Sequence, residues 1–291
     1  MRTRVLLACV GLMSFSGIAA ELRAEGPAEQ QAQGAVDPLA VEDASIEEAE
    51  DPESAVSSPP MAMDDPGTPG PRGIELNLVT EMERAGEGRG SESLFDLNYG
   101  IGHRLQLKYE RPYVTTGQAG EHQQTGLGAT KIGVKWRFLE KDGWQMAAYP
   151  QYQFDDGFTV KDEEGNPEES EGRSTSLPLL ISKTMARVYT AAANLDYSYN
   201  TDHSTSDWVV AFGLGRAFGS NGRVLTEVYS ARDEHFDNRQ TDVRVGVVWM
   251  LFSKAFEFPG YAAIGRSVGP TEEGRPITTF TIGVSIIKPG A

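Results

Sequence analysis

The most informative pattern in this chain is a strict alternation of apolar and polar side chains, and residues 131–138 show it most clearly. In the run KIGVKWRF, a charge or a glycine stands at every odd position and a large apolar side chain at every even one. Because successive side chains of a β-strand point to opposite faces, the run predicts a strand with one polar and one apolar face. What each face meets is the question that decides the fold.

The same alternation recurs from Gly73 to the C-terminus, with aromatic and β-branched residues and regular turn signals. No helical periodicity competes with it. Several stretches are close to the 9–11 residues that a tilted strand needs to cross a bilayer. Twelve strands are predicted, at 74–82, 92–100, 104–113, 127–139, 144–155, 174–183, 187–200, 206–218, 223–232, 239–250, 258–267 and 276–287.

The connections between these strands alternate in length. Short connections are expected at 100–103, 140–143, 184–187 and 219–222, and longer, mostly polar ones at 83–91, 114–126, 156–173, 201–205, 233–239 and 268–276; only 251–257 breaks the parity. A meander with short turns at one end and long loops at the other is typical of an outer-membrane barrel. The prediction is an all-β fold, a transmembrane up-and-down antiparallel β-barrel of about 12 strands over residues 73–291. A soluble β-sandwich, which would need Greek-key crossovers, is the alternative.

In the barrel interpretation the apolar faces meet lipid and the polar faces line the lumen. Aromatic residues near strand ends, such as Tyr109, Trp136 and Trp249, suit the headgroup level of a bilayer. Because a Lys or Arg at the lipid-facing midplane costs roughly 2–4 kcal/mol, the charged side chains are assigned to the lumen. The lumen-facing candidates for a selectivity surface are Arg104, Lys108, Glu110, Lys131, Lys135, Arg137, Asp96, Asp196, Glu227, Asp242 and Arg244.

Five cations from the two neighbouring strands 104–113 and 127–139 would form a basic ladder opposite several carboxylates. Three interpretations of this ladder stay open. It is a surface that draws anionic or polar solutes, a structural network of compensating charges, or the seat of an acidic plug formed by residues 21–72. A lumen bounded by about twelve strands is expected to be narrow or partly occluded.

The N-terminus predicts export. Residues 1–20 have Arg2 and Arg4 followed by an apolar run, which is the pattern of a secretory signal peptide. The only cysteine of the chain, Cys9, lies within it. The mature chain is therefore expected to have no disulfide, no cysteine metal site and no cysteine nucleophile.

Residues 21–72 differ in composition from everything that follows. They contain thirteen Asp and Glu residues against only Arg23 and Arg72, and no aromatic residue. Such a stretch cannot bury enough apolar area to offset its ordering entropy, so the prediction is a disordered acidic segment. This segment accounts for about −11 of the formal net charge of −16.

Two stretches resemble a known family. FDLNYGIGHRLQLKYERPYV at 95–114 and TGLGATKIGVKWRFLEKDGW at 125–144 are similar to the outer-membrane family described as the MetA pathway of phenol degradation, or simply as transporter. The resemblance covers about 95–155. It implies a channel-like barrel associated with hydrophobic or aromatic compounds. The C-terminal TFTIGVSIIKPGA departs from the terminal aromatic residue on which outer-membrane strands typically finish.

The expected function is therefore that of a channel or transporter-like barrel for small solutes in the bacterial outer membrane, with its N-terminal segment in the periplasm. The expected partners are outer-membrane lipids, the barrel-assembly machinery and small solutes. No cofactor, metal or catalytic residue is assigned, and an acidic exported protein is not expected to bind nucleic acid. A non-conducting scaffold or surface-binding barrel is the alternative.

Two further alternatives rest on single features. A lipid hydrolase at the barrel rim would use His203 with Ser204 or Ser206, although the chain lacks the His-x-Ser-Asn run of such lipases. The acidic loop 156–173 would gather divalent cations, although its spacing fits no calcium-binding loop. A solvated histidine and a mobile hydrophilic loop are the simpler interpretations.

Overall fold

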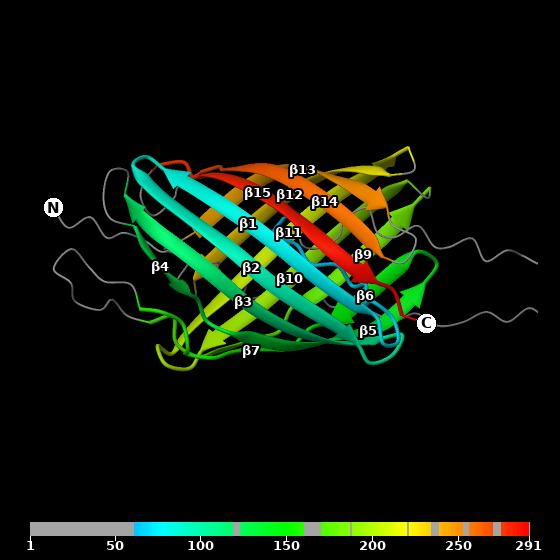
Figure 1. Ribbon diagram of the computed structural model, residues 1–291, viewed down its shortest axis with the longest axis horizontal. Coiled ribbons are helices and arrows are strands. Elements are labelled where there is room, and N and C mark those ends of the chain that lie inside the picture. The colour runs from blue at the N-terminus through cyan, green and yellow to red at the C-terminus, as the bar shows by residue number, and fades with distance from the viewer. Residues whose placement is uncertain are drawn as a thin grey trace, which may run out of the picture.

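The computed structural model describes residues 61–118, 123–159, 170–186, 188–219, 221–233, 239–252, 256–269 and 275–290. Within these ranges no helix has the length and apolar character needed to cross a membrane. The strands of the described chain form one sheet that closes on itself (Figure 1). They are β1 (Ile74–Ala85), β2 (Gly88–Gly100), β3 (Leu105–Gln118), β4 (Gln124–Leu127), β5 (Lys131–Lys141), β6 (Trp144–Ala148), β7 (Gln151–Gln153), β8 (Ser174–Ser176), β9 (Leu179–Met185), β10 (Tyr189–Asn200), β11 (Thr205–Phe218), β12 (Gly222–Asp233), β13 (Arg239–Phe252), β14 (Glu257–Ser267) and β15 (Thr278–Lys288).

These fifteen elements make twelve spans, because three spans are interrupted. Strands β4 and β5 both pair with β3, β6 and β7 both pair with β5, and β8 and β9 both pair with β10. Two interruptions contain Pro150 and Pro178, whose nitrogens have no hydrogen to donate to a ladder. Their carbonyls keep the sheet continuous, since Val134 N donates to Pro150 O at 3.0 Å and Tyr149 N donates to Pro178 O at 2.9 Å. The predicted 12-strand antiparallel barrel is confirmed.

The first and last strands close the barrel. Strand β1 pairs with β15 in an antiparallel ladder that runs from Ile74 opposite Lys288 to Arg84 opposite Thr278. Figure 1 shows the two strands side by side on the near wall. Because closure leaves no edge strand, the ladder satisfies the backbone groups of both terminal strands.

One predicted loop is a tight turn. The sequence predicts a longer connection over 83–91, but β1 and β2 continue past their predicted ends and leave only Gly86 and Glu87 between them. Gly86 has a φ of 61°, which a glycine adopts without steric cost. The prediction failed because the flanking residues are polar and carry no apolar alternation, whereas backbone pairing alone extends the strands. The connections 101–104 and 142–143 are short, and 154–173 and 268–277 are long.

The assignment of faces in the run 131–138 is confirmed. The side chains of Ile132, Val134 and Trp136 are 44%, 39% and 55% exposed on the outside of the barrel, whereas Lys135 is 4% exposed on the inside. The same holds for the other tested strands, whose apolar residues form an exposed exterior. They include Phe95, Leu97, Tyr99, Leu107, Tyr109, Leu195, Tyr197, Tyr199, Val243, Val245, Val247, Trp249, Phe280 and Ile282.

The described chain begins inside the barrel. Residues 61–72 fall in the segment predicted to be disordered, yet they run from the lumen to the end with the short turns, where Arg72 N donates to Gly100 O at 2.8 Å. The chain then enters β1. The remainder of that segment, 21–60, and the predicted signal peptide lie outside the described residues. The boundary of the defined structure therefore moves from Gly73 to Met61, because composition alone does not register the partners that the barrel supplies.

Glycines in the wall make room for inward-facing rings. Tyr261 lies directly opposite Gly283, and a Cβ at Gly283 would come within 2.3 Å of the Tyr261 ring. In the same way, a Cβ at Gly133 would come within 2.5 Å of Tyr149. Both tyrosines are buried. The lumen is thus packed tightly enough that single glycines determine where aromatic rings lie.

Gly283→Val is expected to lower the free energy of unfolding by about 1–3 kcal/mol, because the new side chain displaces Tyr261 in a packed interior. Urea unfolding in lipid vesicles, followed by tryptophan fluorescence, would measure the change. Gly90→Val is the matched control, since the nearest atom to a Cβ there is at 3.8 Å. Equal stability of the two variants would contradict the packing described.

Candidate functional site

The candidate site lies in the lumen, where residues 61–67, here called the luminal segment, pack against the inner wall. The segment has two chemically different parts. Its acidic part, Asp64 and Asp65, contacts β3 and β5, and its apolar part, Met61 and Met63, contacts residues of β1 and β10–β14. The lumen therefore has a charged side and an apolar side, and the segment matches both.

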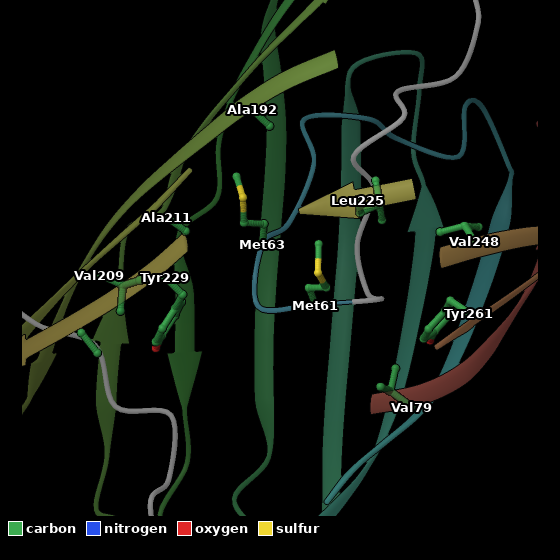
Figure 2. Packing of buried hydrophobic residues seen from close by; sticks show 11 residues of the cluster. Met61, Met63, Val79, Ala192, Val209, Ala211, Leu225, Tyr229, Val248 and Tyr261 are labelled. Carbon is green, nitrogen blue, oxygen red and sulfur yellow. The ribbon is translucent and has the colours of Figure 1, made fainter. Parts of the chain in front are cut away.

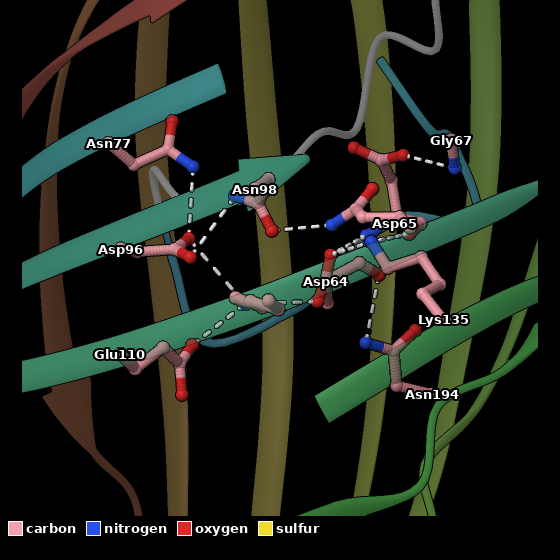
Figure 3. Close-up of polar contacts among 11 residues, drawn as sticks. Asp64, Asp65, Gly67, Asn77, Asp96, Asn98, Glu110, Lys135 and Asn194 are labelled. Carbon is pink, nitrogen blue, oxygen red and sulfur yellow. Dashed lines mark hydrogen bonds and ion pairs between the residues drawn. The ribbon is translucent and has the colours of Figure 1, made fainter. Parts of the chain in front are cut away.

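On the charged side, two lysines hold one carboxylate. Asp64 Oδ1 lies 2.8 Å from Lys135 Nζ, and Asp64 Oδ2 lies 3.4 Å from Lys108 Nζ. Lys135 Nζ also donates to the main-chain oxygen of Asp65 at 2.8 Å (Figure 3). Burial favours the protonated form of Asp64, but the two ammonium groups outweigh it and hold the pKa of Asp64 below its usual value.

Lys108 has further partners in the wall. Its Nζ lies 2.7 Å from Glu110 and 3.5 Å from Asp96. Asp96 accepts hydrogen bonds from Asn77 at 2.9 Å and from Asn98 at 3.1 Å. For Lys135, in contrast, the carboxylate within ion-pair distance among the described residues is Asp64. The two lysines thus differ: the wall compensates Lys108, and the luminal segment compensates Lys135.

Tyr149 lies beneath both lysines. Its ring centroid is 5.2 Å from Lys108 Nζ and 5.5 Å from Lys135 Nζ, within the range of a cation–π contact. Tyr149 belongs to the interruption between β6 and β7, and Gly133 leaves the space for its ring. The pair of lysines is therefore held on an aromatic platform that the strand break provides.

The main chain of the luminal segment is fixed by two polar side chains of the wall. Glu227 on β12 accepts hydrogen bonds from Ala62 N at 3.2 Å and Met63 N at 3.0 Å. Asn194 on β10 donates to the carbonyl of Asp64 at 2.9 Å (Figure 3). A carboxylate that receives two backbone N–H groups fixes the direction of the segment as well as its position.

On the apolar side, Met61 and Met63 lie among wall residues that point inward (Figure 2). Burying a methionine side chain contributes roughly 1.5–3 kcal/mol before entropy is counted. Methionine also adapts its shape to an irregular surface. The apolar patch consists of Val79, Ala192, Val209, Ala211, Leu225, Tyr229, Ala231, Val248 and Tyr261.

A second charged group surrounds Arg244, which lies directly opposite Glu227 on the neighbouring strand. Arg244 on β13 lies 2.6 Å from Glu81 on β1 and 3.6 Å from Asp242, and Thr281 donates to Glu81 at 2.9 Å. Arg244 also lies 5.8 Å from the ring centroid of Tyr229. Because Arg244 and Asp242 are almost fully buried, this group acts as a brace across the lumen between strands that are not neighbours.

The structure divides the predicted basic ladder. Lys108 and Lys135 meet at the carboxylate of Asp64. Lys131 is partly buried opposite Glu110, and Arg137 donates to the carbonyl of His103 at 2.7 Å and pairs with Glu140 at 3.1 Å, near the short turns. Arg104 lies in the bend before β3 and is exposed, so its assignment to a lumen-facing strand position is wrong. The two-residue periodicity holds only within a strand, so it does not predict where the side chain of Arg104 points.

The remaining acidic candidates are buried on inward faces. Asp96, Glu227 and Asp242 have the partners described above. Asp196 is also buried, and its Oδ1 accepts no hydrogen bond from the described residues. Sequence reasoning missed Glu81 and Tyr149 as members of these groups. Glu81 shares the parity of inward residues on its strand and could have been found, whereas Tyr149 lies at a strand break and gave no periodic signal.

The end of the barrel with the longer loops is braced by ion pairs. Arg111 Nη1 pairs with Asp156, which also accepts a hydrogen bond from Thr130 N at 2.7 Å. Arg173 pairs with Asp202 at 2.6 Å, and its hydrogen bonds lower the pKa of Asp202 to about 2. These contacts anchor the loop bases to the sheet.

The two single-feature alternatives gain no support at this end. His203 Nε2 lies 3.0 Å from the carbonyl oxygen of Ser170, a contact that ties two connections together. Most of the acidic loop 156–173 lies outside the described residues. Among the residues that are described, no group of three His, Cys, Asp or Glu side chains is placed to hold a metal ion.

No protein-family model matches the chain, and no curated protein matches it in sequence. Solved structures do match its fold. An outer membrane channel from Pseudomonas putida F1 superposes with a TM-score of 0.53 at 13% identity, over 75% of this chain and 96% of that one. The KdgM porin in complex with disordered oligogalacturonate gives 0.51 at 10% identity, over 73% and 98%. The translocator domain of the autotransporter NalP from Neisseria meningitidis gives 0.50 at 11% identity, over 74% and 88%.

These structures share the barrel with this chain and differ in what their descriptions say they do. A channel, a porin and an autotransporter translocator all match at low identity. The likeness therefore establishes the fold, and function has to be argued from the residues of the lumen.

Asp64→Asn is expected to weaken the docking of the luminal segment on the wall by about 1–3 kcal/mol of free energy, because a charge-assisted contact to a buried lysine is lost. A nitroxide label at Ala62→Cys would report the change as an increase in mobility by electron paramagnetic resonance. Asp142→Asn, in the exposed turn between β5 and β6, is the matched control. If the label is equally immobile in the unchanged chain, in Asp64→Asn and in Asp142→Asn, the ion pair does not hold the segment.

The pH dependence of the same label follows from the lowered pKa of Asp64. A carboxylate with a depressed pKa stabilises docking above its ordinary pKa of 3.8 and loses that contribution as the pH falls through the lowered value. The label is therefore expected to stay immobile from neutral pH down to the ordinary Asp range. Release near pH 6 would contradict the assignment to Asp64.

Proposed function

We propose that this protein is an outer-membrane barrel that passes small solutes and that its luminal segment partly occludes the path. The observation that carries the proposal is the closed barrel with an apolar, exposed exterior and an interior lined by charged groups and one apolar patch. A soluble sheet would bury its apolar face, whereas here the apolar side chains face outward all round the barrel.

The location follows from the same asymmetry. The proposed signal peptide at 1–20 directs export, and the exterior is the surface that lipids of the outer membrane would cover. Insertion would require the barrel-assembly machinery. The short turns and the start of β1 would face the periplasm, with the N-terminal segment, and the longer loops would face the outside.

The lumen supports a role in selecting solutes. Lys108, Lys135, Arg244 and their acidic partners present fixed charges along the path. Such side chains favour particular ions and polar groups when the path is narrow. The apolar patch supports the passage of hydrophobic or aromatic compounds, which the resemblance of residues 95–155 to the phenol-degradation family also implies.

A non-conducting scaffold or binding barrel remains the second candidate, and one observation favours it. The luminal segment is held at both of its parts, by Lys135 and by Glu227, so the barrel as described is partly filled. A permanent filling would leave only the exterior and the loops available for function.

Conductance decides between these two candidates. In planar bilayers the full chain is expected to conduct weakly, and a variant that lacks residues 61–67 is expected to conduct several-fold more, because the segment occupies part of the cross-section. The matched control is a deletion of equal length within 21–60. If neither the full chain nor the shortened variant conducts, the channel proposal is wrong and the scaffold stands.

The membrane location has its own test. Val245 lies near the middle of β13 on the outer face and Leu251 near its end. Val245→Arg is expected to cost about 2–4 kcal/mol of folding free energy in lipid vesicles, and Leu251→Arg only about 0–1 kcal/mol, because the cost of a charge depends on its depth. The folded fraction is read as a heat-dependent mobility shift on a gel. Equal costs at the two positions would argue against a bilayer around the barrel.

A further inference from the structure

We propose that the lumen contains a binding site for solutes that carry one carboxylate on an apolar body, and that the luminal segment occupies this site as a built-in stand-in. In this view the carboxylate of Asp64 takes the place of the solute's acid group, and Met61 and Met63 take the place of its apolar body. The inference rests on the proposed channel function and names the class of solute that the path would favour.

The first argument comes from the partners of Lys135. Lys135 is 4% exposed, and the two oxygens that its ammonium group contacts, Asp64 Oδ1 and Asp65 O, both belong to the luminal segment, each at 2.8 Å. When the segment leaves, the described wall offers this cation no carboxylate within ion-pair distance. The departure of the segment uncovers this cation in a narrow lumen, where its field attracts an anion from solution.

The second argument concerns the number of charges. Lys108 keeps its contacts with Glu110 and Asp96 when the segment leaves. Of the two lysines, Lys135 is then the one with no carboxylate of the wall within ion-pair distance, and two carboxylates lie beside its neighbour Lys108. A monoanion fits this arrangement. A dianion would bring its second charge toward Asp96 and Glu110, and the repulsion would disfavour it.

The third argument is the apolar patch next to the lysines. Asn194 contacts the carbonyl of Asp64, and Ala192, two residues earlier on the same inward face of β10, belongs to the patch that covers Met61 and Met63. Charged and apolar surfaces are therefore continuous along β10. An acid group at Lys135 would direct a ring or a short alkyl chain toward the part of the patch that covers Met63, the neighbour of Asp64.

A fourth observation marks the site as incompletely satisfied. The Oδ1 of Asn194 is buried, and it accepts no hydrogen bond from the described residues. Such an acceptor next to the Asp64 position would receive a hydrogen bond from a hydroxyl group on the solute or from water. The wall thus offers a cation, an apolar surface and a free acceptor within one region.

The test uses the full chain in detergent micelles, with benzoate as the probe and protein-free micelles as the blank. Equilibrium dialysis is expected to show benzoate binding about tenfold more tightly to Asp64→Asn than to the unchanged chain, because the competing carboxylate is gone. Benzamide, which has the same ring without the charge, is expected to bind at least tenfold more weakly than benzoate. Acetate and phthalate, which lack the ring or add a second charge, are expected to bind more weakly as well.

The lysine is tested by substitution. Lys135→Met in the Asp64→Asn background is expected to abolish the preference for benzoate over benzamide. The control is Lys141→Met, which makes the same change on the same strand at an exposed position by the turn. A preference that survives the loss of Lys135, or equal binding of benzoate and benzamide to Asp64→Asn, would overturn the proposal.

Failure of this inference is distinguishable from failure of the channel proposal. If the variants conduct ions in a bilayer but bind benzoate no better than benzamide, the channel stands and the carboxylate site falls. If benzoate binds as expected and no variant conducts, the site stands as that of a binding barrel. Conductance therefore tests the channel proposal, and the comparison of benzoate with benzamide tests the carboxylate site.

Discussion

Closure of the hydrogen-bond ladder between β1 and β15 is the constraint on which the rest of the structure depends. Once the ladder is closed, the strands satisfy one another's backbone groups and no edge is left to solvent or lipid. Side chains alone then determine what each face meets. The exterior can be apolar throughout, and every charged group on an inward position has to find its partner within the lumen.

That second requirement explains why the lumen is organised as small charge groups. Arg244 meets Glu81 and Asp242, and Lys108 meets Glu110 and Asp96, all from wall residues. Lys135 is the exception, because it draws its carboxylate from the luminal segment. The position of the segment is thus tied to a lysine that has no carboxylate of the wall within ion-pair distance. Glu227 fixes the direction of the segment, and the apolar patch adds the methionine contacts.

The same contacts connect occlusion with recognition. A segment that fills a lumen through one carboxylate and an apolar surface can be displaced by a solute that offers both, and the free energy of docking then sets how readily the path opens. A change that strengthens the contact of Lys135 with Asp64 strengthens its contact with a solute carboxylate as well, so selectivity depends on the carboxylates beside the neighbouring Lys108. Asp96 and Glu110 serve this purpose while they compensate Lys108.

The sequence by itself determined the barrel, its number of spans and the faces of its strands, because a period of two residues records which side of a sheet each residue occupies. It identified Lys108, Lys135 and Arg244 as inward charges for the same reason. It did not determine their partners, the two-residue turn at Gly86 and Glu87, or the ordered path of residues 61–72. Those depend on which strands close against which and on contacts between residues far apart in the chain, such as Met63 and Glu227, and only the tertiary structure brings these together.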